Sequence, residues 1–191
     1  CSTYSNSFYQ FATINVNDSI SSKNIFNYSS VTRCGYNISE ALYVLRLNFG
    51  KIYCSSVNIS MNRVKSYSAI FCDSFSDSSS TTCLISYSSF TDNSASEYNV
   101  VGLYTTGAKY EMKCCNILRN TQGTSTWGII YICGSVMIEN SCILENTATY
   151  IFCSSSSSYT FTLSNCTVDK TSNNGYLTTQ NTVTKSFILA L

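Results

Sequence analysis

Proline and histidine are both absent from this sequence, and charged residues make up only 11% of its 191 positions. Average composition predicts about nine prolines in a chain of this length. Proline lacks the backbone N–H that a sheet needs, so its absence suits a fold in which nearly every residue is hydrogen-bonded in strands. Histidine is the commonest metal ligand and the usual general base near neutral pH, so two common catalytic roles have no candidate.

The few charges are balanced and scattered. Eleven Lys and Arg face ten Asp and Glu, for a net charge of +1. Nucleic-acid binding depends on clustered cations, so we expect no nucleic-acid partner. No apolar run is long enough to cross a bilayer, so we expect no membrane span. Apolar residues make up 44% of the chain, enough for the core of one domain, which we place over residues 1–191.

An internal repeat runs through the chain: an apolar residue, two variable residues and then Asn. Apolar residues also stand eight and ten positions before most of these Asn anchors and alternate with polar ones, which is typical of a half-buried strand. A second apolar strand follows each unit, and aligning its ends places Cys72, Thr105, Cys133, Cys153 and Thr178 in one column. The copies are Ile14-x-x-Asn17, Ile59-x-x-Asn62, Phe90-x-x-Asn93, Ile117-x-x-Asn120 and Ile143-x-x-Asn146, with the weaker Ile38-x-x-Ala41 and Val168-x-x-Thr171.

A unit of this size cannot bury its inward face alone. Stacking copies about 4.8 Å apart pairs each strand with its counterparts above and below. The sequence therefore predicts an all-β, right-handed parallel β-helix of about seven coils. Its inward Asn residues would bond to one another and to the backbone. We expect Ile59, Phe90, Ile117 and Ile143 to be stacked and nearly fully buried. A propeller or a left-handed hexapeptide helix fits the repeat length less well.

Two segments resemble a known group. Phe90-x-x-Asn93 and Phe161-x-Leu163-x-Asn165-Cys166-x-Val168 are similar to the repeats of polymorphic outer-membrane proteins and of protist surface proteins. These belong to the right-handed β-helix repeat proteins, which share the fold of pectate lyases. The Gly-Gly-Ala-Ile element common in the polymorphic group is missing here. The resemblance implies a fold and a surface location, and it implies little about activity.

The carboxylates show no catalytic arrangement. Enzymes of the resembled fold usually act on acidic polysaccharides through clustered Asp residues with a calcium ion, or through Asp pairs with a Gly-His-Gly element. Here no two of the ten Asp and Glu residues are adjacent. Glu139 and Glu145 fall at outward offsets, as do Glu111 and Lys113 one coil earlier, so we expect solvated carboxylate–lysine neighbours. We predict no catalytic residue, no metal site, no cofactor and no enzyme activity.

The eleven cysteines fit either disulfides in an oxidising compartment or buried thiols in a core. No Cys-x-x-Cys pair occurs, and without histidine a zinc site has few ligands. One candidate disulfide joins Cys133 to Cys153, which share the aligned column on successive coils. A second joins Cys114 to Cys142 at outward offsets. Residues about 4.8 Å apart lie within disulfide range, although parallel side chains suit a row of thiols equally well.

Five N-glycosylation sequons occur, and their placement says more than their number. Asn37, Asn58 and Asn165 lie at offsets that should face solvent, so we expect glycans there if a eukaryotic cell secretes the chain. Asn17 should stay unmodified because the alignment places it in the inward ladder. The fifth sequon begins at Asn27.

Three function classes are consistent with the sequence. We expect a non-enzymatic structural solenoid that is extracellular or on the cell surface, as a subunit of a fibre or coat. An adhesin or glycan-binding stalk comes second, and an exposed aromatic stripe on one sheet face would favour it. A polysaccharide lyase or hydrolase relative comes third.

Residues 187–191 form an uncharged apolar segment with no cap, so we expect head-to-tail self-association through the terminal coils. A fragment cut from its caps is the alternative.

Overall fold

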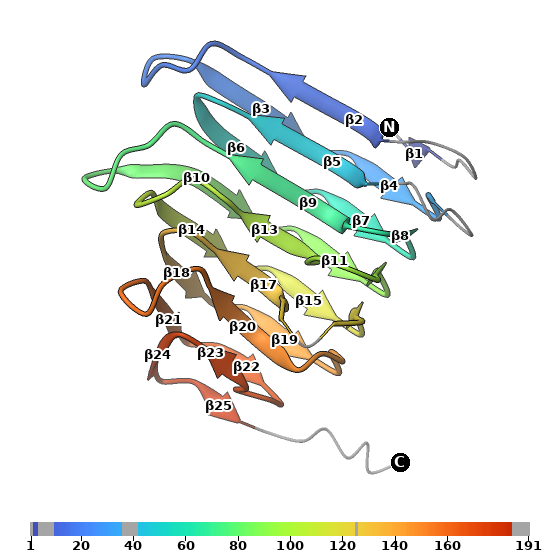
Figure 1. Ribbon diagram of the computed structural model, residues 1–191, viewed down its shortest axis with the longest axis vertical. Helices are drawn as coiled ribbons and strands as arrows, with labels where there is room; N and C mark the ends of the chain where they lie inside the picture. Colours follow the sequence, from blue (N-terminus) through green and yellow to red (C-terminus); the bar gives the residue numbers. More distant parts are fainter. Residues whose placement is uncertain (1, 4–9, 36–41, 125, 185–191) are drawn as a thin grey trace.

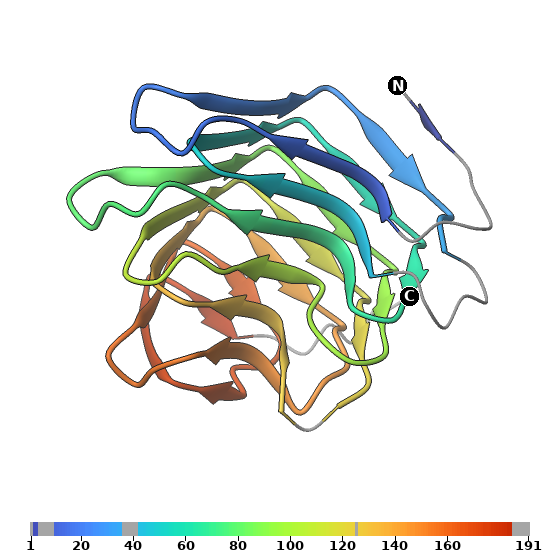
Figure 2. The ribbon, with the colours of Figure 1, turned by 45° about the horizontal axis from the view of Figure 1, so that its top comes forward.

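The computed structural model describes residues 2–3, 10–35, 42–124 and 126–184 (Figure 1). These residues contain strands and no helix, and every strand pairing is parallel. The chain winds as stacked coils from the N-terminal to the C-terminal end (Figures 1 and 2). The predicted all-β parallel β-helix is confirmed. It makes about five turns, slightly fewer than the seven predicted.

Three long sheets and one short sheet form the sides of the coil. Sheet A contains β1 (Ser2–Thr3), β4 (Ser30–Thr32), β7 (Asn58–Ser60), β11 (Ser89–Thr91), β15 (Asn116–Leu118), β19 (Cys142–Leu144), β22 (Thr167–Val168) and β25 (Val183–Thr184). Sheet B contains β2 (Gln10–Asn15), β5 (Tyr43–Asn48), β9 (Tyr67–Asp73), β13 (Val101–Leu103), β17 (Gly128–Ile132), β20 (Tyr150–Ser154) and β23 (Asn173–Asn174).

The remaining strands complete each turn. Within one coil the chain passes from sheet C to sheet A and then to sheet B, with sheet D between A and B. Sheet C contains β3 (Lys23–Asn27), β6 (Lys51–Ser55), β10 (Thr81–Ser86), β14 (Lys109–Lys113), β18 (Ser135–Glu139), β21 (Thr160–Ser164) and β24 (Tyr176–Gln180). Sheet D contains β8 (Arg63–Val64), β12 (Ser94–Ala95) and β16 (Thr121–Gln122).

The predicted inward column of sheet A is confirmed. Ile59, Phe90, Ile117 and Ile143 stand in register on successive strands, and each is 0% exposed. Val168 extends the column at β22. Sheet C has similar inward columns, in which large apolar side chains such as Tyr110 and Phe161 are fully buried. The core therefore fills the inside of the coil along its length.

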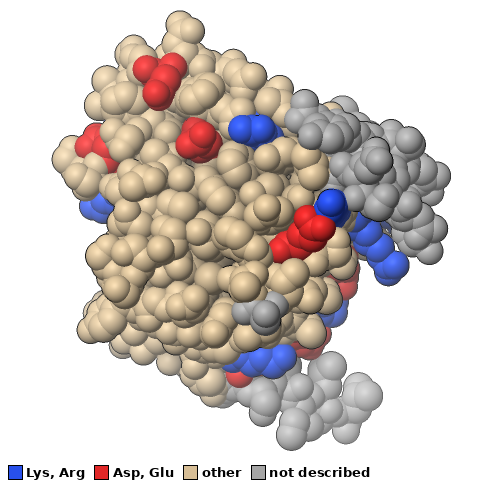
Figure 3. All heavy atoms as spheres, viewed as in Figure 1, with Lys and Arg blue, Asp and Glu red and all other residues tan. Residues whose placement is uncertain are grey.

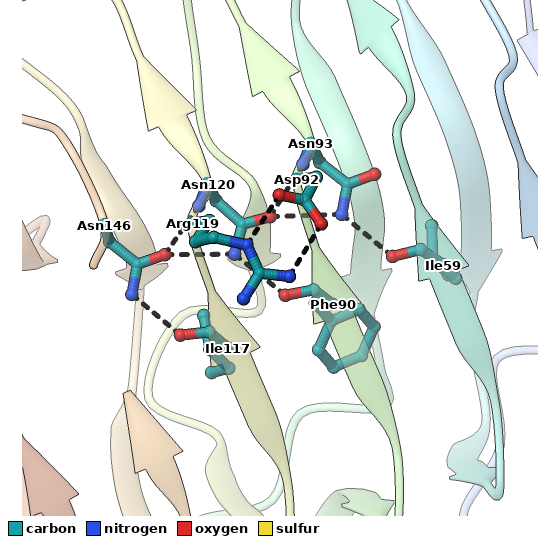
Figure 4. Close-up of polar contacts among 8 residues, drawn as sticks. All are labelled: Ile59, Phe90, Asp92, Asn93, Ile117, Arg119, Asn120 and Asn146. Carbon is teal, nitrogen blue, oxygen red and sulfur yellow. Dashed lines mark hydrogen bonds and ion pairs between the residues drawn. The ribbon is translucent and has the colours of Figure 1, made fainter. Parts of the chain in front are cut away.

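Buried Asn side chains connect neighbouring coils, as predicted (Figure 4). Oδ1 of Asn120 accepts hydrogen bonds from the backbone N and the Nδ2 of Asn93, at 3.0 and 3.1 Å. Nδ2 of Asn120 also donates to the carbonyl of Phe90 at 2.8 Å. The same pattern joins Asn62 to Asn93 and Asn120 to Asn146. Each of these Asn residues is at most 1% exposed, so bulk water does not compete for its hydrogen bonds.

The repeat alignment is wrong in its first copy. Ile14 belongs to sheet B, where it stands opposite Leu47, and Asn17 is exposed after β2. The residue that precedes Ile59 in its column is Val31. Cys34 takes the ladder position there, because its backbone N donates to Oδ1 of Asn62 at 2.8 Å. The weak copy at Ile38 and Ala41 lies outside the described residues.

Candidate functional site

Aromatic side chains gather on the outer face of sheet B. In five pairs of neighbouring rings, the two ring centroids lie 4.7–5.3 Å apart. The same side of the molecule shows few, scattered charges in Figure 3. This aromatic cluster consists of Tyr43, Tyr67, Phe71, Tyr98, Tyr104, Trp127 and Tyr131.

A glycine gives the cluster room for one of its rings. Gly102 occupies the outward column of sheet B between Phe71 and Tyr131. A Cβ atom on Gly102 would lie 2.7 Å from the ring of Tyr104, so a side chain there would displace that ring. The Tyr104 hydroxyl donates to Oδ1 of Asn99 at 2.8 Å, which fixes the ring in place.

The rings of the aromatic cluster contact one another more than they contact solvent. Tyr67 stacks on Tyr43 with an interplanar angle of 6° and on Tyr98 with an angle of 24°. Tyr67, Phe71 and Tyr131 are only 6–8% exposed. Burial raises the pKa of Tyr67 to about 12. The guanidinium of Arg46 lies over the ring of Tyr43, 4.9 Å from its centroid. The cluster is thus a second apolar layer outside the coil.

Two further tyrosines stand alone and open to solvent. Tyr28 and Tyr87 are 80% and 69% exposed. Together with Ser30, Asn58 and Ser89 they line a groove of about 530 Å³ at the corner between sheets C and A. Ser29, Ser56 and Val57 complete the lining of this tyrosine groove.

Glu111 and Glu139 pair with Lys113 on a solvated face, as predicted. Nζ of Lys113 lies 2.8 Å from Glu111 and 3.4 Å from Glu139, on the outer face of sheet C. The hydrogen bond from Lys113, together with one from Thr81, lowers the pKa of Glu111. Arg119 donates to both carboxylate oxygens of Asp92 (Figure 4). Glu145 is exposed. Among the described residues, no group of three or more Cys, Asp and Glu could hold a metal ion.

The predicted disulfides are not formed. Cys153 stands opposite Tyr131 in sheet B, so Cys133 and Cys153 do not share a column. Cys142 stands opposite Asn116, two residues from Cys114. All four are free thiols. The proposed column with Cys72 and Thr105 is also wrong, because Cys72 pairs with Leu103 and Leu103 with Ile132.

Several thiols instead fill the core, which is the second of the two arrangements that the sequence predicted for the cysteines. Cys115 and Cys166 occupy a turn position that Ser88 and Ser141 occupy in other coils. All four donate to the carbonyl two residues earlier. Burial raises the pKa of Cys115 to about 11 and that of Cys54 further. A buried thiol that stays protonated is a poor nucleophile.

These buried thiols and phenols predict loss of stability at alkaline pH. An unfolded chain ionises Cys near its ordinary pKa, about 8.5, whereas folded Cys54 and Cys115 stay neutral to higher pH. Their raised pKa therefore favours the folded state fully below about pH 8.5, and that advantage is lost as the pH rises. The urea midpoint should be the same at pH 7 and pH 8, because the chain has no histidine, and clearly lower at pH 10. An equal midpoint at pH 10 would contradict the buried thiols.

Three of the five sequons are exposed, Asn27 is half-buried, and one lies outside the described residues. Asn58 in β7 is exposed, and Asn165 is exposed in the turn before β22, as predicted. Asn37 lies outside the described residues. Asn17 is exposed, so its predicted place in the inward ladder is wrong and it is not protected by burial. Of the described residues, none lies in a helix long and apolar enough to cross a membrane.

Comparison with known proteins gives no further assignment. No protein-family model, no curated protein and no solved structure matches this chain. Any functional conclusion therefore depends on the chain's own residues.

Proposed function

We propose that the chain is a non-enzymatic structural solenoid of an extracellular fibre or cell-surface coat. The continuous Asn ladder is the observation that supports this proposal most. It joins four successive coils by side-chain and backbone hydrogen bonds, from Asn62 to Asn146. Each coil is thereby fixed along the axis as well as around it, which is the property that a stiff rod needs. The proposed kinship with right-handed β-helix repeat proteins rests on the Phe90-x-x-Asn93 unit, whose Asn belongs to this ladder, and on the segment from Phe161 to Val168.

The aromatic cluster favours this proposal over a glycan-binding stalk. A sugar-binding surface needs ring faces that are open to solvent. The stacked faces of Tyr43, Tyr67 and Tyr98 are turned toward one another. The carboxylates likewise support the non-enzymatic role, since Glu111 and Glu139 are both paired with Lys113. We regard the cluster as a layer that stiffens sheet B.

The proposed fibre forms by head-to-tail stacking of copies. All the strands of a sheet run in the same direction, so the outermost strands at one end of a copy can pair with those at the other end of the next. The two ends differ, so the contact repeats as an open filament. Leu177 and Thr184 on the last strands continue the inward columns of sheets C and A after Phe161 and Val168. Their burial in such a contact would stabilise it.

Assembly can be tested on the purified full chain. We expect rods of variable length in negative-stain electron micrographs. Thr184→Lys should shift sedimentation to the monomer, because it places a charge in the inward column of the edge strand β25. Thr106→Lys is the matched control, since Thr106 is exposed on the side of the coil, and it should leave the rods intact. A monomer at millimolar concentration without any substitution would contradict the fibre.

A further inference from the structure

The tyrosine groove spans three coils at one repeated turn. Tyr28, Ser56 and Tyr87 occupy the same turn position, and their φ angles are 51°, 56° and 50°. Each backbone N donates to a carbonyl of the next coil, at Ser55, Ser86 and Lys113 respectively. The small Ser56 side chain between two tyrosines leaves the space that forms the groove.

Packing does not account for these two tyrosines. Non-Gly residues with positive φ recur at the turns of the coils, Arg33, Met61 and Arg119 among them, so this conformation does not set the two tyrosines apart. Later coils place Asn140, Asn165 and Asn181 at the same turn, and Asn adopts this conformation readily. Tyr28 and Tyr87 expose most of their surface, so core packing does not hold their rings. Two solvent-facing rings that line one groove offer faces on which a ligand can pack.

A glycosylation sequon begins on the floor of this groove. Asn58 is exposed and lies in register between Ser30 and Ser89. It starts the sequence Asn58-Ile59-Ser60. Two coil steps separate Tyr28 from Tyr87, or roughly 10 Å along the axis. This distance exceeds two van der Waals contacts of about 3.5–4.0 Å, so one sugar ring fits between the tyrosines.

We propose that Asn58 carries an N-linked glycan whose first N-acetylhexosamine lies in the tyrosine groove, between Tyr28 and Tyr87. This inference rests on the extracellular location in the proposed function. No charged residue lines the groove, which suits a neutral sugar. The C–H face of the sugar packs on the aromatic rings. Its hydroxyl and acetamido groups lie within reach of the hydroxyls of Ser30 and Ser89.

The glycan arrives by ordinary transfer from a lipid diphosphate-linked oligosaccharide. A bond forms between Asn58 Nδ2 and C1 of the sugar, and the bond from C1 to the phosphate oxygen breaks. One amide proton leaves with the lipid diphosphate. Transfer precedes folding, and the turns at Tyr28 and Tyr87 then close on either side of the attached sugar.

The test uses the full chain secreted from a eukaryotic host. Site-resolved mass spectrometry should find Asn58 and Asn165 both occupied. Nuclear Overhauser contacts should join the first sugar on Asn58 to the rings of Tyr28 and Tyr87, with upfield sugar shifts. Asn58→Gln should lower Tm by about 2–4 °C. That difference should vanish when Tyr28→Gly and Tyr87→Gly remove both rings, since Gly suits the left-handed turn.

Asn165 is the matched control. It is an exposed sequon at the same turn, and the neighbouring coils place Asn140 and Asn181 beside it. Its sugar should show no aromatic contacts, and the Tm effect of Asn165→Gln should not depend on the tyrosines.

A bare Asn58 beside an occupied Asn165 overturns this inference and leaves the fibre proposal standing. An occupied Asn58 whose sugar lacks ring contacts also overturns it. Binding of soluble diacetylchitobiose to the Asn58→Gln protein, with Asn58 bare in the parent, would assign the groove to a free glycan instead.

Discussion

Ile117→Asp should unfold the middle coils of the solenoid. Ile117 is 0% exposed and stands between Phe90 and Ile143 in the inward column. A carboxylate there has no cation and no water, so its burial costs several kcal/mol. A domain of this size has a free energy of unfolding of about 5–15 kcal/mol. Circular dichroism should show loss of the strand signal. If some strand signal remains, a urea titration should give an unfolding midpoint close to zero urea.

The neighbouring residue provides the control for this prediction. Asn116 precedes Ile117 in β15 and is exposed. Asn116→Asp places the same carboxylate one residue away on the solvated face of the same strand. We expect a change within about 0.5 kcal/mol. Equal losses for the two variants would show that the faces of β15 are assigned wrongly.

Asn120→Ala should cost about 3–5 kcal/mol, because it leaves buried groups without partners. The substitution removes the acceptor for the N and Nδ2 of Asn93 and the donor to the carbonyl of Phe90. A buried polar group that loses its partner costs about 1–3 kcal/mol. Chemical unfolding measures the loss.

A double substitution tests whether the Asn residues act as one ladder. Asn93→Ala and Asn120→Ala both remove the hydrogen bond from Nδ2 of Asn93 to Oδ1 of Asn120, so their combined cost should be below the sum of the single costs. Asn116→Ala, at an exposed position of β15, should change stability little. Additive losses would mean that each Asn acts alone.

The parts of the fold that could be read from the sequence are those with one solvated face. Strand β15 buries Ile117 between the exposed Asn116 and the half-buried Leu118. Strand β18 likewise alternates around Val136 and Ile138. This alternation fixes which residues face inward, and it located the columns of sheets A and C correctly from the coil of Ile59 onward.

Sheet B could not be aligned in the same way, because the aromatic cluster buries its outer face. Every residue of β17, from Gly128 to Ile132, is buried, and so are the first six residues of β9. A strand that is buried on both faces shows no alternation. The aligned cysteine column was therefore off register, and the prediction of a Cys133–Cys153 disulfide failed with it. The Cys114–Cys142 prediction failed separately, because Cys142 stands opposite Asn116 in sheet A. The cluster itself depends on Tyr98 and Trp127, which lie before their strands at offsets that only the structure shows.

The tyrosine groove was hidden for a different reason. Cys34 replaces Asn at the ladder position of its coil, so the apolar-x-x-Asn unit has no recognisable copy there. The chance match Ile14-x-x-Asn17 took its place in the alignment. The alignment consequently gives Tyr28 no place next to Tyr87. Its alignment with Tyr87, which creates the groove, became visible only in the structure.

The most direct test of the stacked, in-register coils is a methyl-labelled nuclear Overhauser experiment on the isoleucines. The structure predicts contacts from the Ile117 methyl groups to the Phe90 ring on one side and to the Ile143 methyl groups on the other, with Ile59 next to Phe90. Ile14 should show contacts to Leu47 and none to this column. Absence of the contacts of Ile117 to both Phe90 and Ile143 would contradict the parallel β-helix itself.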